Sequence, residues 1–517
     1  MKKLPYIIAG TAAVAVVGGA IILNANHSAI DSSKIEGTMQ IDNGDLKINW
    51  ERYQTYDITL SSAYTITSSG TYHFTGNLTD GAIIVNAVES DVRIILDNVT
   101  ITNASGPAII GYAADDIVIE LVGESTLTDA SKYSTDLDED ITGAIYSKAD
   151  LTFQGDGTLN LIANYEDGIV AKDDLKFNSG TYNISAVDDG IRGKDSVYIV
   201  NGNYTIKATG DAIKSTNELD AGKGFVLIEN GTFNLTPGAK GIKAINSILI
   251  YGGEYQIDST DDAIHSNNYV GIVGGNYTIT SGDDGIHADK ELVIEGGKVT
   301  ITKSYEGLEA QAITINGGEL SITASDDGLN AGGGADASAT NRVGAGAFDV
   351  DTNCVLAING GNLYVNAAGD GIDSNGYLYF NGGTVTVDGP TNNGNGALDA
   401  GASIVQNGGT VIAVGASGMA TTLGNSSSIY NASIYLTATS PAGTKITIKD
   451  NSGNTIISHT SAKAFAHIAV GSPDFKMGET YTVYLDDVVY QTFTISSITT
   501  TVGNTNQNFN QMNRTRR

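Results

Sequence analysis

The sequence predicts an all-β protein whose main part is a right-handed parallel β-helix. A unit of about 22 residues recurs over residues 80–415, and each copy begins with an acid, then Gly or Ala, then Ile or Leu. Short strands follow, in which apolar residues occupy every second position, and glycine-containing turns separate these strands. The unit has no helical spacing. Each unit is therefore expected to form one coil, and the sequence contains about 13 coils.

The aliphatic residue after Gly or Ala sets the register of the main coils. Most steps between these residues are 22 residues long. Two longer steps contain residues 216–223 and 332–347, which we interpret as loop insertions in an intact stack. We expect the series to form one interior column, because equivalent residues of adjacent coils lie about 4.8 Å apart. The series is Ile169, Ile191, Ile213, Ile242, Ile264, Ile286, Leu308, Leu329, Ile372 and Leu398, with less regular copies at Ile83, Ile109 and Ile145.

An aromatic series runs through the same coils and allows two interpretations. A row of aromatic rings is one way to build a platform for sugars. Each ring here, however, stands two residues before an apolar residue such as Ile184 or Ile206, which places it on the inward face of its strand. We therefore expect a core column made of Tyr182, Tyr204, Phe233, Tyr255 and Tyr277.

Five segments are expected along the chain. Lys2 and Lys3 precede an apolar run, so residues 1–25 are predicted to be a signal peptide or an N-terminal membrane anchor. Residues 26–75 are expected to cap the stack, and the β-helix occupies residues 76–425. The glycine repeat then stops, and residues 426–502 are expected to form a C-terminal β domain or cap. Residues 503–517 are predicted to be disordered. A secreted or bacterial cell-surface location follows from the first segment.

Composition narrows the function further. There are 58 acidic against 28 basic residues, which gives a formal net charge of −30. Such a chain repels nucleic acid and anionic lipid and attracts cations. We expect no nucleic-acid partner, and membrane contact only through an uncleaved N-terminal segment. The single cysteine, Cys354, excludes an internal disulfide framework.

Acidic residues recur at one corner of the predicted coils. They stand just before Gly or Ala, and in several coils a second acid precedes them. Neighbouring carboxylates repel one another, so something must compensate them. Either Asp side chains cap N–H groups of the turns, or Ca²⁺ lies between coils, and the length of the series favours Ca²⁺. The predicted ligands, interrupted by Lys240, are Asp167, Asp188, Asp189, Asp211, Asp261, Asp262, Asp283, Asp284, Glu306, Asp326, Asp327, Asp370 and Asp373.

A further series stands two positions after Gly or Ala and changes from basic to acidic along the chain. Its acidic end includes Asp373 and Asp399. Its basic end can pair with acidic sugars, so we predict a carbohydrate-binding role for Arg192, Lys214, Lys243, His265 and His287. Zinc is not expected, because the two histidines have no compact partner set in the sequence.

The repeated Asp-Asp-Gly-Ile units and the Asn-Gly-Gly turns, such as residues 316–318, 359–361 and 381–383, resemble a bacterial family. This is the clostridial-type β-helical carbohydrate-binding family of the cell surface, associated with cellulose and acidic sugars. The resemblance covers residues 40–420. It implies a right-handed helix, a pectate-lyase-like fold and Ca²⁺ on the acids just named. Lys240 departs from the pattern and weakens the expectation of a metal ion at its coil.

Three functions are compatible with these features. The favoured one is calcium-dependent, non-catalytic binding of an acidic polysaccharide such as polygalacturonate, or of cellulose. The second is a calcium-dependent lyase, with Asp189 and Asp211 near the metal and Arg192, Lys194 or Lys214 as the base. The third is a structural surface protein or adhesin. We assign no catalytic residue, because the sequence shows no cleft-forming arrangement.

Overall fold

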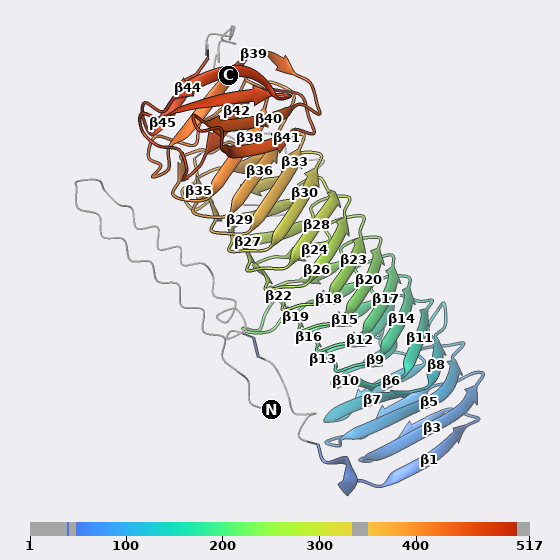
Figure 1. The fold of residues 1–517 in the computed structure, drawn as a ribbon. Coiled ribbons are helices and arrows are strands. Elements are labelled where there is room, and N and C mark those ends of the chain that lie inside the picture. The colour runs from blue at the N-terminus through green and yellow to red at the C-terminus, as the bar shows by residue number, and fades with distance from the viewer. Residues whose placement is uncertain (1–38, 41–47, 333–349, 504–517) are drawn as a thin grey trace, which may run out of the picture.

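The computed structural model describes residues 39–40, 48–332 and 350–503. These residues form an elongated, nearly all-β stack in which strands lie across the long axis (Figure 1). Parallel strands dominate a 41-stranded sheet, and a separate 4-stranded sheet lies near the C-terminus. The described part contains a single 3₁₀ turn, Trp50–Arg52, and no α-helix. None of its helical segments is long and apolar enough to cross a membrane.

Three columns of parallel strands, called faces 1, 2 and 3, make up the stack. Each strand pairs with the strand that occupies the same place in the next coil, as in a β-helix. β27 and β29 contribute to both face 1 and face 2, and β3 and β5, given below with face 2, continue into face 3. The all-β, parallel architecture expected from the repeat is therefore confirmed.

Face 1 carries the aliphatic residue of each unit. Its strands are β2 (Tyr64–Ile66), β4 (Ile83–Asn86), β6 (Ile109–Ala113), β9 (Gly143–Ser147), β12 (Asp167–Ala171), β15 (Ile191–Gly193), β18 (Ile213–Ser215), β21 (Ile242–Ala244), β24 (Ile264–Ser266), β27 (Ile286–Ile294), β29 (Leu308–Ile315), β31 (Leu329–Ala331) and β34 (Ile372–Ser374).

Face 2 follows face 1 in each coil. Its remaining strands are β1 (Thr55–Leu60), β3 (Gly70–Leu78), β5 (Val92–Thr102), β7 (Asp116–Val122), β10 (Asp150–Gly155), β13 (Asp174–Phe177), β16 (Ser196–Ile199), β19 (Phe225–Ile228), β22 (Ser247–Ile250), β25 (Tyr269–Ile272), β32 (Val355–Ile358), β35 (Tyr377–Phe380) and β37 (Ser403–Gln406).

Face 3 completes the coil. Its strands are β8 (Glu124–Thr128), β11 (Thr158–Ala163), β14 (Thr181–Ala186), β17 (Asn203–Ala208), β20 (Thr232–Pro237), β23 (Glu254–Asp258), β26 (Asn276–Thr280), β28 (Lys298–Lys303), β30 (Glu319–Ala324), β33 (Asn362–Ala367), β36 (Thr384–Asp388) and β38 (Thr410–Gly415).

The predicted register of face 1 is confirmed at every main position. Ile169 pairs with Ile191, and the series continues without a slip to Leu329, Ile372 and a last bridge to Leu398. All these side chains are buried. The stack keeps its register because a shift of one residue would turn every apolar side chain outward. Residues 216–223 lie between β18 and β19, as expected for an insertion, whereas almost all of 332–347 lies outside the described residues.

The aromatic series belongs to the core, as expected. All five rings are buried. Consecutive ring centroids lie 5.1, 4.9, 4.7 and 4.5 Å apart, with interplanar angles of at most 10°. The rings therefore stack along the rod axis on the inner side of face 3.

Parallel pairing begins at β1, within the segment expected to be the N-terminal cap. β1 pairs with β3 and β2 pairs with β4, so this segment contributes the first strands of the stack. Further along the rod, Met39 packs against Phe225, Leu227 and Leu249 on the outside of face 2. The predicted signal or anchor segment, 1–25, lies outside the described residues, as does all of 503–517 except Gly503.

The stack ends in antiparallel strands with a core of their own. β42 pairs in antiparallel fashion with β38, the last strand of face 3, and with β39, whereas β39 and β45 are parallel. The 4-stranded sheet has the order β41-β40-β43-β44. This C-terminal unit covers the open edge of the last coil, which would otherwise expose unpaired backbone groups (Figure 1). Its strands are β39 (Asn431–Ser440), β40 (Lys445–Asp450), β41 (Thr455–Thr460), β42 (Phe465–Gly471), β43 (Thr480–Leu485), β44 (Val488–Thr494) and β45 (Thr499–Val502).

Candidate functional site

The predicted acidic residues form one column at the corner that leads into face 1. The acids that stand directly before Gly or Ala are buried from Asp167 to Glu306, because the corner turns their side chains toward the neighbouring coil and away from solvent, and they are half-buried at Asp327 and Asp370. Lys240 takes one place in this series and is also buried. We call the series the acidic column: Asp167, Asp189, Asp211, Lys240, Asp262, Asp284, Glu306, Asp327 and Asp370.

One oxygen of most of these carboxylates caps the next coil. The backbone N–H of Asp189 donates to Asp167 Oδ1 at 3.1 Å, and that of Asp211 donates to Asp189 Oδ1 at 2.9 Å. The same bond joins Asp284 to Asp262 Oδ1 at 2.9 Å. Further bonds of this kind end on Asp211, Asp284 and Asp327. N–H capping, one of the two explanations considered for the column, thus accounts for one oxygen of each of these residues.

The second oxygen meets a cation in the N-terminal part of the column. Arg192 lies 2.7 Å from Asp167 Oδ2. Lys214 bridges two coils, 3.1 Å from Asp189 Oδ2 and 3.0 Å from Asp211 Oδ2. Burial alone would lower the pKa of Lys214, but these two carboxylates outweigh it and raise that pKa above its ordinary value. This part of the column is therefore compensated by the protein's own basic residues.

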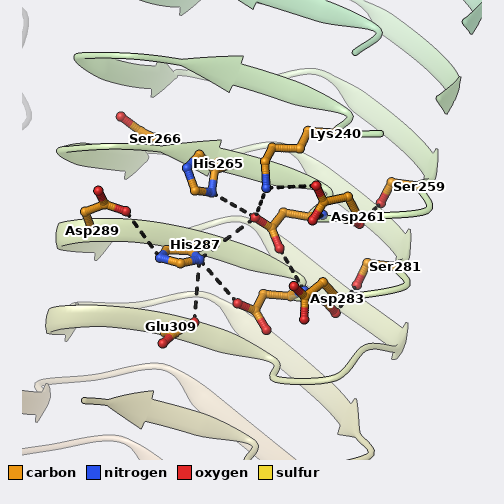
Figure 2. Close-up of polar contacts among 12 residues, drawn as sticks. Lys240, Ser259, Asp261, His265, Ser266, Ser281, Asp283, His287, Asp289 and Glu309 are labelled. Carbon is orange, nitrogen blue, oxygen red and sulfur yellow. Dashed lines mark hydrogen bonds and ion pairs between the residues drawn. The ribbon is translucent and has the colours of Figure 1, made fainter. Parts of the chain in front are cut away.

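Lys240 and two histidines surround the carboxylate of Asp262. Lys240 Nζ lies 2.6 Å from Asp262 Oδ2, and His265 Nδ1 lies 2.8 Å from the same oxygen (Figure 2). His287 stands one coil further along, directly in register with His265. Its Nδ1 faces Asp284 and Glu309. The expectation that the histidines lack a compact partner set is therefore wrong, because stacking brings together carboxylates from three successive coils.

The C-terminal part of the column has a different electrostatic character. Among the described residues, no Lys, Arg or His forms an ion pair with Asp327 or Asp370 of the column, or with Asp373 beside them on β34. Burial raises the pKa of Asp327 to about 8, with repulsion from Asp370 and Asp326 adding to the rise. Burial likewise raises the pKa of Asp370 to about 6 and that of Asp373 to about 7, and the carboxylate of Asp399 adds to both. This cluster of carboxylates lacks a compensating positive charge in the described structure.

The remaining predicted ligands lie at the outer side of the corner. Asp188 is exposed, and Asp261, Asp283 and Asp326 are half-buried. Asp261 Oδ2 lies 3.1 Å from Lys240 Nζ. In each Asp-Asp pair, the residue with the lower number is thus at least partly exposed to solvent, whereas the residue with the higher number faces the next coil.

The five residues predicted to bind carbohydrate are buried or half-buried in the structure. His265 and His287 are 3% and 0% exposed, so they do not offer a surface to a polymer. Arg192 and Lys214 are half-buried in ion pairs with the acidic column. Lys243 is half-buried and stands in register between Lys214 and His265. The five residues do lie in one column. Four of them, Arg192, Lys214, His265 and His287, contact buried carboxylates of the acidic column.

Two features were missed from the sequence. A second row of acids begins the strands of face 2, where Asp116, Asp150 and Asp174 lie in register. Burial and the neighbouring Asp173 raise the pKa of Asp150 to about 7. The recurrence of Asp at the start of these strands is the signal that could have revealed this row. The second feature is Asp289, whose Oδ1 lies 3.5 Å from His287 Nε2 and which follows no repeat.

Face 3 presents a shallow groove of polar side chains. Outward-facing residues of four adjacent strands line it, and they lie in register from coil to coil. The lining includes Asn234, Gln256, Thr278 and Thr300, beside Thr232, Glu254, Asn276 and Lys298.

The fold and the column define a class of protein, a parallel β-helix-like rod with charged residues repeated at one corner. A family model described as carbohydrate-binding domain-containing protein matches residues 60–257, 236–285 and 283–328. These matches together span more than half of the 517 residues. The chain therefore belongs to this carbohydrate-binding domain family.

A relative and a solved structure accompany this match. A carbohydrate-binding domain-containing protein of Acetivibrio thermocellus is 40% identical over 197 residues, which cover 37% of this chain and 69% of that protein. A polysaccharide lyase-like protein from C. thermocellum, solved as a gadolinium derivative, is 30% identical with a TM-score of 0.39. That alignment covers 46% of this chain and 95% of the solved chain.

Proposed function

We propose that this protein binds an acidic polysaccharide, such as polygalacturonate, with the help of Ca²⁺ and without catalysis, at the bacterial cell surface. Membership of a carbohydrate-binding domain family supports the polysaccharide partner. The observation that carries the calcium part is the carboxylate cluster of Asp327, Asp370 and Asp373, which forms no ion pair with the basic residues that the structure describes. We also propose that the stack is a right-handed β-helix of about 13 coils.

The donor chemistry of this cluster fits Ca²⁺. Carboxylate and backbone oxygens are the ligands that Ca²⁺ prefers, in a shell of six to eight atoms at loose geometry. Asp327, Asp370 and Asp373 are half-buried and not sealed from solvent, so a bound ion would keep room for outside oxygens. When bound, Ca²⁺ would supply positive charge that a uronate carboxylate can share with the protein. Between Asp167 and Asp262, by contrast, Arg192, Lys214 and Lys240 form ion pairs with the buried carboxylates.

The lyase alternative requires a base that can accept a proton. Lys214 was one of the three candidates, and its raised pKa keeps its ammonium group protonated between Asp189 and Asp211. Arg192 is engaged with Asp167 and, as a guanidinium, holds its proton at any ordinary pH. For Lys214 and Arg192, these contacts favour binding over lysis.

Polygalacturonate binding, measured by calorimetry with Ca²⁺ or with chelator, tests the proposal. We expect binding in Ca²⁺ only and a loss of at least about tenfold in affinity for Asp370→Asn with Asp373→Asn. Asp195→Asn, in the turn between β15 on face 1 and β16 on face 2, should cause no change. Equal affinity in chelator, or an unchanged double variant, would contradict the calcium role. The appearance of unsaturated product in ultraviolet absorbance would contradict the non-catalytic role.

A second candidate, calcium-independent binding of a neutral polymer such as cellulose, is favoured by the polar groove on face 3. Its amide and hydroxyl side chains repeat with the coil spacing and suit a polymer of hydroxyl groups. We expect Asn234→Ala with Thr278→Ala to weaken cellulose binding in chelator while leaving polygalacturonate binding intact. If the same double variant binds cellulose as the parent does, the groove is not the site. Surface location is tested separately by cell fractionation with the full N-terminal segment.

A further inference from the structure

His287 is completely buried yet makes no hydrogen bond through either ring nitrogen. Its Nδ1 lies 3.3 Å from Asp284 Oδ2, 3.5 Å from Glu309 Oε2 and 3.9 Å from Asp262 Oδ2 (Figure 2). Its Nε2 lies 3.5 Å from Asp289 Oδ1. A charge-assisted N–H···O hydrogen bond is about 2.7–2.9 Å long. The carboxylates thus surround this imidazole at a distance too long for such bonds.

His265 provides an internal comparison one coil away. It occupies the same register position as His287 and is also buried. Its Nδ1 lies 2.8 Å from Asp262 Oδ2, which is an ordinary hydrogen bond. Lys240 holds the same carboxylate oxygen. The long contacts are therefore particular to His287 and do not arise from the register or from burial.

We propose that Asp284, His287 and Glu309 hold one divalent transition-metal ion of the zinc class. Zinc bound to nitrogen and oxygen at about 2.0–2.1 Å in a tetrahedron separates its ligand atoms by about 3.3 Å. The contacts of His287 Nδ1 with the two carboxylates, 3.3 and 3.5 Å, match the edges of such a tetrahedron. Their ligand atoms lie within 4.8 Å of one another.

The strand register explains how residues from two successive coils form this donor set. Asp284 is the acid of its corner, and His287 follows three residues later on β27, so both come from one coil. Glu309 lies on β29, where it pairs directly with His287 in the next coil. The parallel register therefore fixes the three ligand positions before any ion arrives.

Asp289 completes the arrangement from the other side of the ring. A histidine ligand usually donates its remaining N–H to a carboxylate, which fixes the tautomer and aligns the metal-binding nitrogen. Asp289 Oδ1 is buried beside His287 Nε2 and makes no hydrogen bond of its own. A neutral imidazole with Nδ1 on the metal and Nε2–H toward Asp289 would use both nitrogens.

This site differs from the calcium cluster in chemistry and place. It uses an imidazole nitrogen in a fully buried position, whereas Ca²⁺ takes oxygen ligands in a larger shell. A transition metal ion selects imidazole and carboxylate in few, close positions. The two proposals can therefore fail separately, because the zinc-class ion does not depend on polysaccharide binding.

Cobalt(II) is the probe for the test, because a tetrahedral Co²⁺ site absorbs visible light strongly. The full chain is stripped with chelator and titrated with Co²⁺. We expect one Co²⁺ per chain with a visible absorption band that Zn²⁺ abolishes and excess Ca²⁺ leaves unchanged. His287→Gln should lose the band, and the matched variant His265→Gln should keep it. Polygalacturonate binding should be unchanged by His287→Gln.

The wild-type chain alone can overturn the proposal, so the result does not depend on whether His287→Gln folds. Nitrogen-15 spectra of labelled histidine report the protonation of both ring nitrogens of His287. With Zn²⁺ present, we expect one protonated nitrogen and one metal-bound nitrogen. Two protonated nitrogens, or a folded chain that takes up no Co²⁺, would show that His287 serves as a buried cation and that no metal ion binds there.

Discussion

At the scale of single residues, the buried carboxylates in the N-terminal part of the acidic column have two separate roles. The first oxygen of each accepts the N–H of the next coil, and the second oxygen meets a cation. Asp189 shows both, with Asp211 N on one side and Lys214 on the other. The pairing holds because a buried N–H without an acceptor and a buried charge without a partner both cost free energy.

Replacing Asp189 by alanine should therefore destabilise the protein strongly. We expect a loss of about 2–4 kcal/mol, because the N–H of Asp211 loses its acceptor and Lys214 keeps only one of its two carboxylates. Asp189→Asn should cost less, since the amide oxygen still accepts the N–H. Urea unfolding followed by circular dichroism gives the free energy. The exposed neighbour, Asp188→Ala, is the control and should stay within about 0.5 kcal/mol.

The C-terminal end of the acidic column, which has no ion pair among the described residues, predicts that stability falls as the pH rises. An unfolded Asp loses its proton near pH 4, at about its reference pKa, whereas that of Asp327 is raised to about 8 in the folded chain. Between these values the folded state binds more protons, so stability is present at low pH and is lost as the pH rises. In chelator, the melting temperature should fall from about pH 5 to about pH 8.

Asp327→Asn isolates this effect because its amide oxygen can still accept the N–H of Asp370. We expect a shallower fall with pH and a gain on the order of 1 kcal/mol at the alkaline end. Saturating Ca²⁺ should flatten the wild-type profile as well. A wild-type profile in chelator that is already flat, or one equal to that of Asp327→Asn, contradicts the assignment of Asp327 as an uncompensated acid.

At the scale of an element, face 3 combines an inward aromatic column with the turn that precedes each strand. Each tyrosine of the column donates its hydroxyl to a carbonyl three residues earlier, as Tyr255 does to Gly252 at 2.8 Å. The turn itself requires glycine, since Gly253 has a φ of 116°. The ring thus fills the core while its hydroxyl fastens the turn.

Two substitutions at Tyr255 separate these contributions. Tyr255→Phe should cost about 1 kcal/mol, because only the hydrogen bond to Gly252 is lost. Tyr255→Ala should cost about 3–5 kcal/mol, because the stack between Phe233 and Tyr277 gains a cavity. Thermal unfolding of both variants checks this order. Equal losses would show that the hydroxyl, and not the stacked ring, carries the stability.

At the scale of the whole molecule, one buried carboxylate joins the stack to the C-terminal unit. Asp388 lies at the end of β36, on face 3, and is fully buried. It accepts hydrogen bonds from His459 at 2.7 Å, Ser461 at 3.0 Å and the backbone N–H of Ala462 at 3.0 Å. Tyr364 donates a fourth, at 2.9 Å, from within the stack. The link fixes the unit over the last coils.

Asp388→Ala should loosen the C-terminal unit while leaving the middle of the rod intact. Four donors lose their acceptor, so we expect about 2–4 kcal/mol of local destabilisation. Hydrogen exchange should accelerate in β40–β44 and stay unchanged in β14–β26. Uniform acceleration along the whole rod would show that the stack and the C-terminal unit unfold as one.

The same contact predicts an acid sensitivity. Burial would raise the pKa of Asp388, but the hydrogen bonds from His459 and Ala462 outweigh it and hold this pKa below its ordinary value. Stability from Asp388 is thus present above the unfolded pKa, about 4, and is lost as the pH falls through the lower folded value. Exchange in β40–β44 should therefore rise below about pH 4 in the wild type, with a weaker change in Asp388→Asn.

Much of the fold could be predicted because each coil repeats the same pattern at a nearly constant spacing along the chain. Alternation places Ile191 and Tyr204 inward, and the 22-residue step places Ile213 beside Ile191 in the next coil. The antiparallel C-terminal unit has no such repeat, so its pairing and the contact of Asp388 with His459 could not be predicted from spacing. The predicted site was recovered as a column, but its division into compensated and uncompensated parts was not.

The sequence by itself determined the register of the stack and the line of acids at its corner, because both follow from a period and an alternation along the chain. Only the tertiary structure decided which charges meet. Arg192 reaches back one coil to Asp167, and His287 meets Glu309 of the following coil. The reason is physical, since the energy of a charge depends on its burial and on every neighbour within a few ångströms. Those neighbours come from different coils, whose residues are far apart along the chain.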